Sequence, residues 1–276
     1  MHPMLHTATR AARAAGRFIL TNLDRSDRLH IKEKAKNDFV SEVDWQAEKA
    51  IVDMLRNTYP EHAIKAEESG SIEGNERYQW IIDPLDGSAN FLHGIPQFCV
   101  SIGLKIDGRM AAGVIYDPVK EEMFTTSRGD GAYLNNRRIR VATRRSLQGS
   151  VLATEFPSYH HCLHQPYLQL FADMLRATGD VRRQACTALD LAYVACGRMD
   201  GYWSASLQEW HIAAGSLLIQ EAGGLVGDLA GGHTHLDTGD IIATNAKLFP
   251  AMLKIIRPYV AALRQNHPAA HSGSTV

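Results

Sequence analysis

The stretch "WIIDPLDGSANF", residues 80–91, places two carboxylates, Asp83 and Asp86, at the end of an apolar run. The run is typical of a buried strand, and a proline between the aspartates stiffens the turn that follows. Core packing does not explain two carboxylates three residues apart on a turn, whereas a hard cation held by both relieves their repulsion. Gly87 and the hydroxyl of Ser88 follow where a helix can begin, which suits a phosphate group. The alternative is an ordinary Asp-Gly turn with a solvated Asp83.

Two further acidic segments precede this stretch. "AEESG" offers Glu67 and Glu68 after a short apolar run, and "DFVSEVD" offers Asp38 and Asp44 before a helical pattern. Taken alone, each segment is typical of a solvated surface or a helix cap. Taken with the two aspartates, they predict a divalent cation site made of oxygen ligands only.

The first half of the chain, residues 1–145, combines helices with a sheet. Apolar periodicity predicts helices over residues 4–23 and 42–58. Strand-like runs that alternate with Gly and Asn turns predict an antiparallel meander over residues 80–142. This half carries the acidic metal-binding motifs.

The second half, residues 146–262, has an alternating α/β pattern that we expect to complete a substrate pocket. Its predicted elements are a strand at "SVLATEF", a helix over residues 165–177, a short strand near Val181, a helix over residues 188–196 and a helix after His211. Residues 263–276 are polar and aperiodic, which predicts a disordered tail.

Composition excludes several classes of protein. The chain has 276 residues, 45% of them hydrophobic and 21% charged, with a formal net charge of -1. It has no apolar run of the ~20 residues that a membrane span requires, and no overall basic charge for nucleic acid. Its four cysteines form no CxxC pair, which argues against a zinc knuckle or a disulfide framework. The N-terminus has the pattern of a helix rather than a signal peptide, so we predict a cytoplasmic protein without a membrane partner.

Three motifs together resemble the inositol monophosphatase family. They are "AEE", "DPLDGSANF" and "EWHIAAG…EAGG", in the order and at the spacing of the family, and the likeness covers about residues 1–260. Within the family the chain is most similar to the bacterial SuhB branch, through "MHPML", "EESGSIEG" and "LDLAYVACGRMDGYW". The resemblance implies an α+β fold, layered as an α/β/α/β/α sandwich and usually dimeric. It also implies Mg²⁺-dependent hydrolysis of a phosphate monoester with lithium as an inhibitor.

The resemblance implies that the first metal is held by Glu67, Asp83 and the backbone carbonyl of Leu85. It implies that the second metal is shared by Asp83 and Asp86. Two metal ions roughly 4 Å apart can activate a water and neutralise the phosphate charge, which is what ester hydrolysis at neutral pH requires. Hard oxygen ligands favour Mg²⁺.

The resemblance also implies which side chains prepare the nucleophile. Ser88 stands where the family usually has threonine. With Glu67 and Asp44, it would position and activate a metal-bound water. The amides of Gly87 and Ser88 would face the phosphate group.

The chain departs from the family at the second metal. Trp210 is followed by His211, where the family has an aspartate ligand. A neutral imidazole suits Zn²⁺, Mn²⁺ or other transition metals better than Mg²⁺, and a protonated one repels a cation. His211 therefore either binds a metal in place of the aspartate or only caps and packs the helix.

Further departures fall in the substrate pocket that the resemblance implies. Ser204 stands where the family has a glutamate that contacts substrate hydroxyls. Ala185, Cys186 and Thr187 replace a run of Gly, Ser or Thr, and Ala, while Arg182 remains as the matching basic residue. Such changes weaken polyol binding by on the order of 1 to 3 kcal/mol per lost partner.

Two functions follow as hypotheses. The first is a phosphatase of inositol 1-phosphate or a similar small polyol phosphate, weakened by His211 and Ser204. The second is a binding protein with little or no catalysis, since the SuhB branch joins the transcription antitermination machinery through a Nus factor, RNA polymerase and RNA. A local arginine-rich run is compatible with such contacts, although a solvated strand edge is the more common explanation of such a run. The run consists of Arg137, Arg138, Arg140, Arg144 and Arg145.

Overall fold

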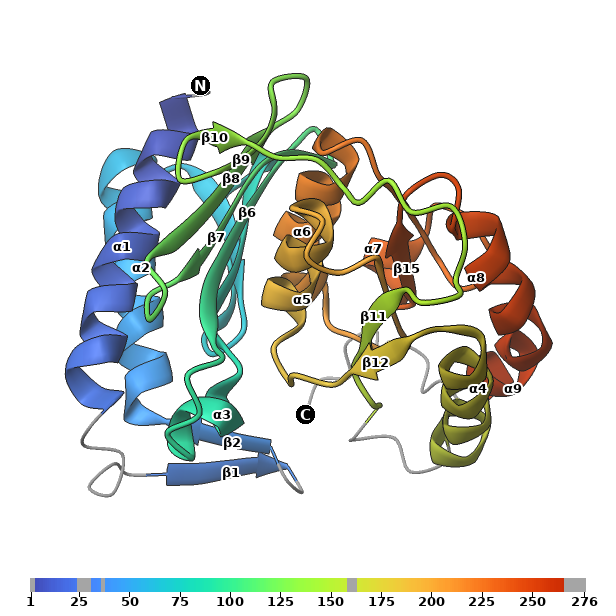
Figure 1. Cartoon of the computed structure of the whole chain (residues 1–276). Coiled ribbons are helices and arrows are strands. Elements are labelled where there is room, and N and C mark those ends of the chain that lie inside the picture. The colour runs from blue at the N-terminus through green and yellow to red at the C-terminus, as the bar shows by residue number, and fades with distance from the viewer. Residues whose placement is uncertain (1–2, 24–30, 36–37, 158–162, 266–276) are drawn as a thin grey trace.

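Helices and sheets alternate in five layers in the computed structural model of the chain (Figure 1). The structure describes residues 3–23, 31–35, 38–157 and 163–265. The outer helices on one side are α1 (Pro3–Leu23) and α2 (Glu42–Thr58), and those between the sheets are α5 (Thr187–Ala195) and α6 (Glu209–Glu221). The predicted α+β sandwich is confirmed.

The larger sheet has eight strands in the order β10-β9-β8-β7-β6-β5-β3-β4. Its strands are β3 (His62–Ala66), β4 (Gly70–Ile72), β5 (Asn75–Asp86), β6 (Cys99–Ile106), β7 (Arg109–Asp117), β8 (Glu122–Ser127), β9 (Gly131–Leu134) and β10 (Arg137–Arg138). From β5 onward the neighbours pair antiparallel, as the predicted meander requires. The sheet also extends before residue 80, because β3 pairs parallel with β5.

The smaller sheet has five strands in the order β12-β11-β13-β15-β14, with parallel pairs around β11 and antiparallel pairs around β15. Its strands are β11 (Val151–Thr154), β12 (Asp180–Arg182), β13 (Gly201–Ser204), β14 (Leu225–Gly227) and β15 (Ile241–Thr244). The predicted strands at "SVLATEF" and near Val181 are β11 and β12.

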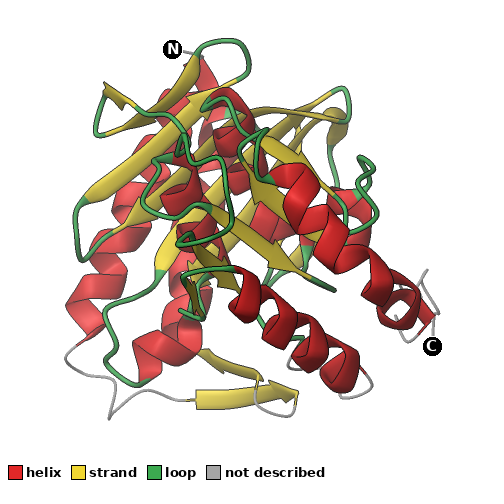
Figure 2. Ribbon diagram, turned by 45° about the vertical axis from the view of Figure 1, so that its right-hand side comes forward, coloured by secondary structure: helices red, strands yellow, loops and turns green. Residues whose placement is uncertain are grey.

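The remaining elements are short or peripheral. The hairpin of β1 (Ile31–Ala35) and β2 (Asp38–Ser41) stands apart from both sheets (Figure 2). The others are α3 (Ser88–Leu92), α4 (His164–Ala177), α7 (His235–Thr238), α8 (Phe249–Ile256), the 3-10 helix η3 (Arg257–Tyr259) and α9 (Val260–Gln265). Residues 263–265, which we expected in the disordered tail, are helical because Leu263 packs in the core of the outer layer. Residues 266–276 lie outside the described part.

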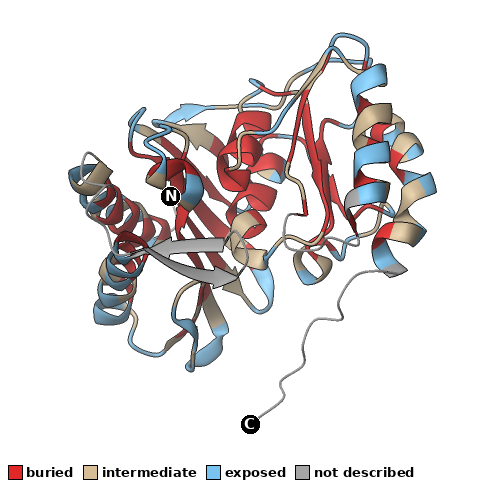
Figure 3. Cartoon of the chain, turned by 90° about the horizontal axis from the view of Figure 1, so that it is seen from below, coloured by how far each residue is buried: buried red, intermediate tan, exposed pale blue. Residues whose placement is uncertain are grey.

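The two central helices are buried on nearly every side (Figure 3). α6 packs closely against the larger sheet because Gly113 of β7 has no side chain. A methyl group built there would lie 3.1 Å from the Cα atom of Ala214. This close approach brings α6 against the sheet in which β5 ends at the candidate site.

Candidate active site

Asp83 and Asp86 face one site because the end of β5 is irregular. In a regular strand, residues three apart point to opposite faces. Here the pairing with β6 shifts, since Asp83 lies opposite Ser101 and Asp86 lies opposite Cys99. The extra residue is introduced at a proline, which cannot donate to the ladder. Oxygen atoms of both aspartates and a ring nitrogen of His211 consequently lie within 4.8 Å of one another.

His211 reaches the aspartates because the start of α6 is anchored to the larger sheet. Glu209, in the first turn of α6, accepts hydrogen bonds from Lys65 of β3, at 2.8 Å, and from Lys105 of β6. Burial opposes ionisation of Glu209, but the hydrogen bonds from the two lysines outweigh it and lower the pKa of Glu209. Two residues later, His211 Nδ1 lies 2.8 Å from Asp83 Oδ2.

The site concentrates negative charge away from water. Asp83 is 0% exposed and Asp86 is 7% exposed. Burial, and then the charge of Asp86, raises the pKa of Asp83 well above its usual range. Burial also raises the pKa of Asp86, although the nearby His211 and the amide of Ala188 oppose the shift. Two buried carboxylates whose oxygens lie within 4.8 Å of an imidazole nitrogen are a ligand set that a divalent cation would stabilise.

The hydroxyl of Ser88 links the segment that carries Asp44 to the segment that carries Asp83 and Asp86. Ser88 begins α3, directly after Gly87, whose φ of 94° is in the left-handed region that glycine tolerates. Ser88 Oγ lies 2.6 Å from Asp44 Oδ1 and 2.8 Å from the carbonyl oxygen of Leu85. Asp44 is itself buried in the first turn of α2. Three of the predicted site residues are therefore connected by hydrogen bonds.

Glu67 is brought to the site by the chain that follows β3. Its amide donates to the carbonyl of Ile82 at 3.1 Å, and its side chain shares a hydrogen bond with Asp83. The turn after Glu67 is held by Glu48, a buried carboxylate of α2. Glu48 accepts the amide hydrogens of Glu68 and Ser69, both at 2.8 Å.

Glu48→Ala should lower the free energy of unfolding by on the order of 2–3 kcal/mol, because two amides lose a charged acceptor. Asp53→Ala, on an exposed part of the same helix, should change it by less than about 0.5 kcal/mol. Chemical denaturation of the parent and both variants measures the difference. Equal effects of the two substitutions would show that Glu48 does not hold the turn.

The start of α5 and the loop before it contact the site from the second half of the chain. The Ala188 amide donates to Asp86 Oδ2 at 2.6 Å, and Asn90 of α3 donates to the carbonyls of Gln184 and Ala185. Ala185 has a φ of 54°, a conformation that costs a non-glycine residue about 1 kcal/mol or more. The alanine that replaces the family's glycine is therefore strained.

Ala185→Gly should consequently raise the free energy of unfolding, by up to about 1 kcal/mol after the greater freedom of glycine in the unfolded chain is subtracted. Ala188→Gly, three residues later at a helical position of α5, should lower it by about 1 kcal/mol. Thermal or urea unfolding of both variants measures whether each substitution raises or lowers the free energy of unfolding. A loss of stability in Ala185→Gly would contradict the strain at this residue.

Two residues predicted to contact the substrate make contacts within the protein. Ser204 is 0% exposed in β13, and its hydroxyl donates to the carbonyl of Glu155 at 3.0 Å. Arg182 is exposed and pairs with Asp180. Its neighbour Arg183 instead pairs with Glu155 at 2.7 Å, and the pKa of Glu155 is raised by burial despite this partner. Ser204 is thus packed inside the protein. Arg183, rather than Arg182, forms the ion pair with the half-buried Glu155.

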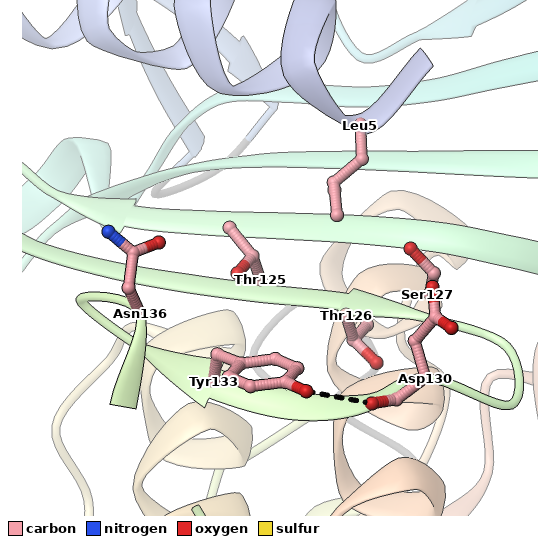
Figure 4. Close-up of a pocket in the computed structure, with 7 residues that line it drawn as sticks. All are labelled: Leu5, Thr125, Thr126, Ser127, Asp130, Tyr133 and Asn136. Carbon is pink, nitrogen blue, oxygen red and sulfur yellow. Dashed lines mark hydrogen bonds between the residues drawn. The ribbon is translucent and has the colours of Figure 1, made fainter. Parts of the chain in front are cut away.

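A separate cavity of about 330 Å³ lies at the other end of the larger sheet (Figure 4). Leu5 of α1 and side chains of β8, β9 and their flanking turns line it, among them Tyr133, whose hydroxyl donates to the carbonyl of Asp130. Figure 1 places the start of α1 and the short helix α3 at opposite ends of this sheet. The cavity is therefore not part of the site around the aspartates.

Sequence reasoning missed Glu48 and Glu209, which hold the site together without belonging to it. A carboxylate four residues after Asp44, on the side of α2 that carries the apolar stripe, was a signal for Glu48. Glu209 gave no such signal, because its lysine partners come from strands far away in the chain.

Comparison with known proteins agrees with this geometry. The model of the inositol monophosphatase family matches residues 1–267. The chain belongs to the inositol monophosphatase family. A curated family relative, Nus factor SuhB of Pseudomonas aeruginosa, is 49% identical over 265 residues, which cover 94% of this chain and 98% of that protein.

Solved structures give the same assignment. The crystal structure of extragenic suppressor protein suhB from Bartonella henselae has a TM-score of 0.90 and 41% identity, covering 92% of this chain and 98% of that one. The structure of inositol monophosphatase from Anabaena has a TM-score of 0.79 and 38% identity, with 97% of each chain covered. The resemblance seen in the sequence is thus confirmed, and none of the described helices has the length and apolar character to cross a membrane.

Proposed function

We propose that this inositol monophosphatase family member is a metal-dependent phosphomonoesterase. The observation that carries the proposal is the meeting of Asp83, Asp86 and His211, whose ligand atoms lie within 4.8 Å of one another. Both aspartates are buried, and the charge of Asp86 helps to raise the pKa of Asp83. Such a ligand set fits a divalent cation, and the nearby Glu67 and the carbonyl of Leu85 add hard oxygens.

Mg²⁺ is the cation we propose for the oxygen-rich part of the site, with Mn²⁺ or Zn²⁺ as alternatives beside His211. When bound, the cation supplies charge neutralisation at the phosphate and lowers the pKa of water. The hydrogen bond between His211 Nδ1 and Asp83 leaves the other ring nitrogen for a ligand. Lithium is proposed as an inhibitor because the family resemblance implies it.

The chain's own side chains would prepare the attacking water. We propose that Glu67 and Asp44 orient it, the latter through the hydroxyl of Ser88, which lies 2.6 Å from Asp44. Gly87 and Ser88 stand at the start of α3 and would present their amides to the phosphate group. The Ala188 amide keeps Asp86 in place at 2.6 Å.

The proposed substrate is inositol 1-phosphate or a similar small polyol phosphate, turned over slowly. Ser204 is buried and does not supply the carboxylate that the family uses for substrate hydroxyls. The strained Ala185 and the thiol of Cys186 lie next to the residue that holds Asp86. Recognition of the polyol would then depend mainly on the phosphate and metal contacts.

Phosphate release from a panel of esters tests this function. Inositol 1-phosphate, glycerol phosphate and 4-nitrophenyl phosphate should all be hydrolysed in Mg²⁺. Asp86→Asn serves as the blank. Turnover equal to the blank in Mg²⁺, Mn²⁺ and Zn²⁺ alike would overturn the phosphatase proposal.

A second candidate function is transcription antitermination. The relatives of Pseudomonas aeruginosa and Escherichia coli that are 49% and 46% identical are named Nus factor SuhB. The arginines 137, 138, 140, 144 and 145 are all exposed on and after β10, at the edge of the larger sheet. We propose that this run contacts RNA, RNA polymerase or a Nus protein.

Co-purification with RNA polymerase tests the second function. The parent should retain polymerase, and reversing the charge of Arg137 and Arg138 should abolish retention without changing turnover. Arg176→Glu, on the exposed side of α4, is the matched control. Equal retention by both variants would contradict a role for the run. The homodimer and the cytoplasmic location remain predictions.

A further inference from the structure

Two cysteines that are far apart in the sequence meet behind Asp86. Cys99 begins β6, directly opposite Asp86 in the sheet, and Cys186 immediately precedes α5. Both thiols are 0% exposed. Their sulfur atoms are 3.7 Å apart, and Cys186 Sγ lies 3.5 Å from Asp86 Oδ2.

These distances match those between the ligands of one tetrahedral zinc ion. Two thiolates, each about 2.3 Å from zinc, lie about 3.8 Å apart, and a thiolate and a carboxylate oxygen lie about 3.5 Å apart. The ligand atoms of Asp86, Cys99 and Cys186 all lie within 4.8 Å of one another. The arrangement therefore needs little movement to accept a cation.

We propose that Cys99, Cys186 and Asp86 form a binding site for a soft divalent cation, Zn²⁺ or Cd²⁺. Each thiol releases its proton to solvent as its sulfur binds, so one cation replaces two protons. Thiolate sulfur favours soft or borderline cations, whereas Mg²⁺ prefers oxygen. This sulfur site shares Asp86 with the site at Asp83, Asp86 and His211, but its two thiols favour a softer cation than the Mg²⁺ proposed there.

Asp86 belongs to both ligand sets, which gives the sulfur site a consequence for catalysis. A carboxylate drawn toward the sulfur atoms is less available to the cation beside Asp83. Soft cations should then inhibit the Mg²⁺-dependent reaction, a consequence that rests on the proposed phosphatase function. Binding of the cation itself does not depend on that function.

Cadmium titration followed by ultraviolet absorption tests the site, because sulfur bound to cadmium gives a charge-transfer band. The reduced parent should show the band saturating at one equivalent. Cys99→Ala and Cys186→Ala should each weaken cadmium binding at least about tenfold. Cys196→Ala is the matched control, since that half-buried thiol lies outside the cluster, and it should bind as the parent does.

Three results would overturn the proposal. They are the absence of a band in the parent, its persistence in both Cys99→Ala and Cys186→Ala, or its loss in Cys196→Ala. Circular dichroism of each variant confirms folding, and two independent cysteine variants keep the test valid if one fails to fold.

A second arm measures inhibition of the Mg²⁺-dependent reaction by Zn²⁺. Cys99→Ala should keep its turnover and need at least about tenfold more Zn²⁺ for half inhibition. Equal inhibition of parent and variant would contradict competition for Asp86. Because the cadmium band is measured without substrate, a parent that lacks turnover would contradict only the phosphatase proposal.

Discussion

Asp83→Asn should abolish Mg²⁺-dependent turnover, with a loss of at least about 100-fold, because Asp83 is the residue shared by both proposed metal positions. The substitution preserves the shape of the side chain. The amide oxygen can still accept from the Leu85 amide, and the amide nitrogen can donate to His211. Phosphate release measures the loss of turnover, and calorimetry measures the loss of Mg²⁺ binding.

The same substitution should stabilise the protein when no cation is present. Asp83→Asn removes a buried charge beside Asp86, so the free energy of unfolding without metal should rise by on the order of 1 kcal/mol or more. The stabilisation that Mg²⁺ gives the parent should disappear in the variant. Thermal unfolding with and without Mg²⁺ measures both effects. Destabilisation of the metal-free variant would contradict the repulsion between the aspartates.

The pH dependence of stability provides an internal check. The pKa of Asp83 is raised in the folded protein, so the folded state holds this proton more tightly than the unfolded chain does. The metal-free parent should therefore lose stability as the pH rises from the ordinary aspartate pKa through the raised one. Asp83→Asn should show a smaller slope over the same range. An unchanged slope would assign the dependence to other groups.

His211→Asp should raise Mg²⁺-dependent turnover by about 10- to 100-fold. The change adds an anionic, hard oxygen ligand next to Asp83 and Asp86, where the parent offers an imidazole. Without metal, a third carboxylate should lower stability through repulsion. Activity and melting temperature, each measured with and without Mg²⁺, separate these effects.

His211→Asn is the matched control for this prediction. It has nearly the shape of the aspartate but no charge, so it should not gain activity. A gain in both variants would assign the effect to the smaller side chain. If neither variant gains activity while both stay folded, His211 does not limit catalysis, and the antitermination function becomes the better account.

The sequence was sufficient to predict the layered fold and the segments that build the site. The apolar stripes of α1 and α2 and the alternation in the larger sheet are local patterns, so their elements could be predicted within a few residues. The pairing of β3 with β5 joins a short strand to a sheet predicted from residue 80 onward, and no local pattern marked it.

The site was predictable only in part because its geometry depends on distant contacts. The three residues Asp83, Asp86 and His211 were identified from motifs, but the irregular pairing that turns both aspartates inward appears only when β6 is in place. The roles of Arg182 and Ser204 were assigned by position in a motif. Ser204 instead donates to the carbonyl of Glu155, and Arg182 pairs with Asp180, which are contacts that the motif does not describe.

The most direct test of the central claim is phosphate release from inositol 1-phosphate as a function of Mg²⁺ concentration, in the parent and in Asp86→Asn. We expect the parent's rate to rise from the metal-free baseline and saturate, and lithium to suppress it. We expect Asp86→Asn to stay at the baseline, because the loss of one carboxylate removes a ligand of the buried site. A parent rate that does not depend on Mg²⁺, or one that Asp86→Asn shares, would contradict the account.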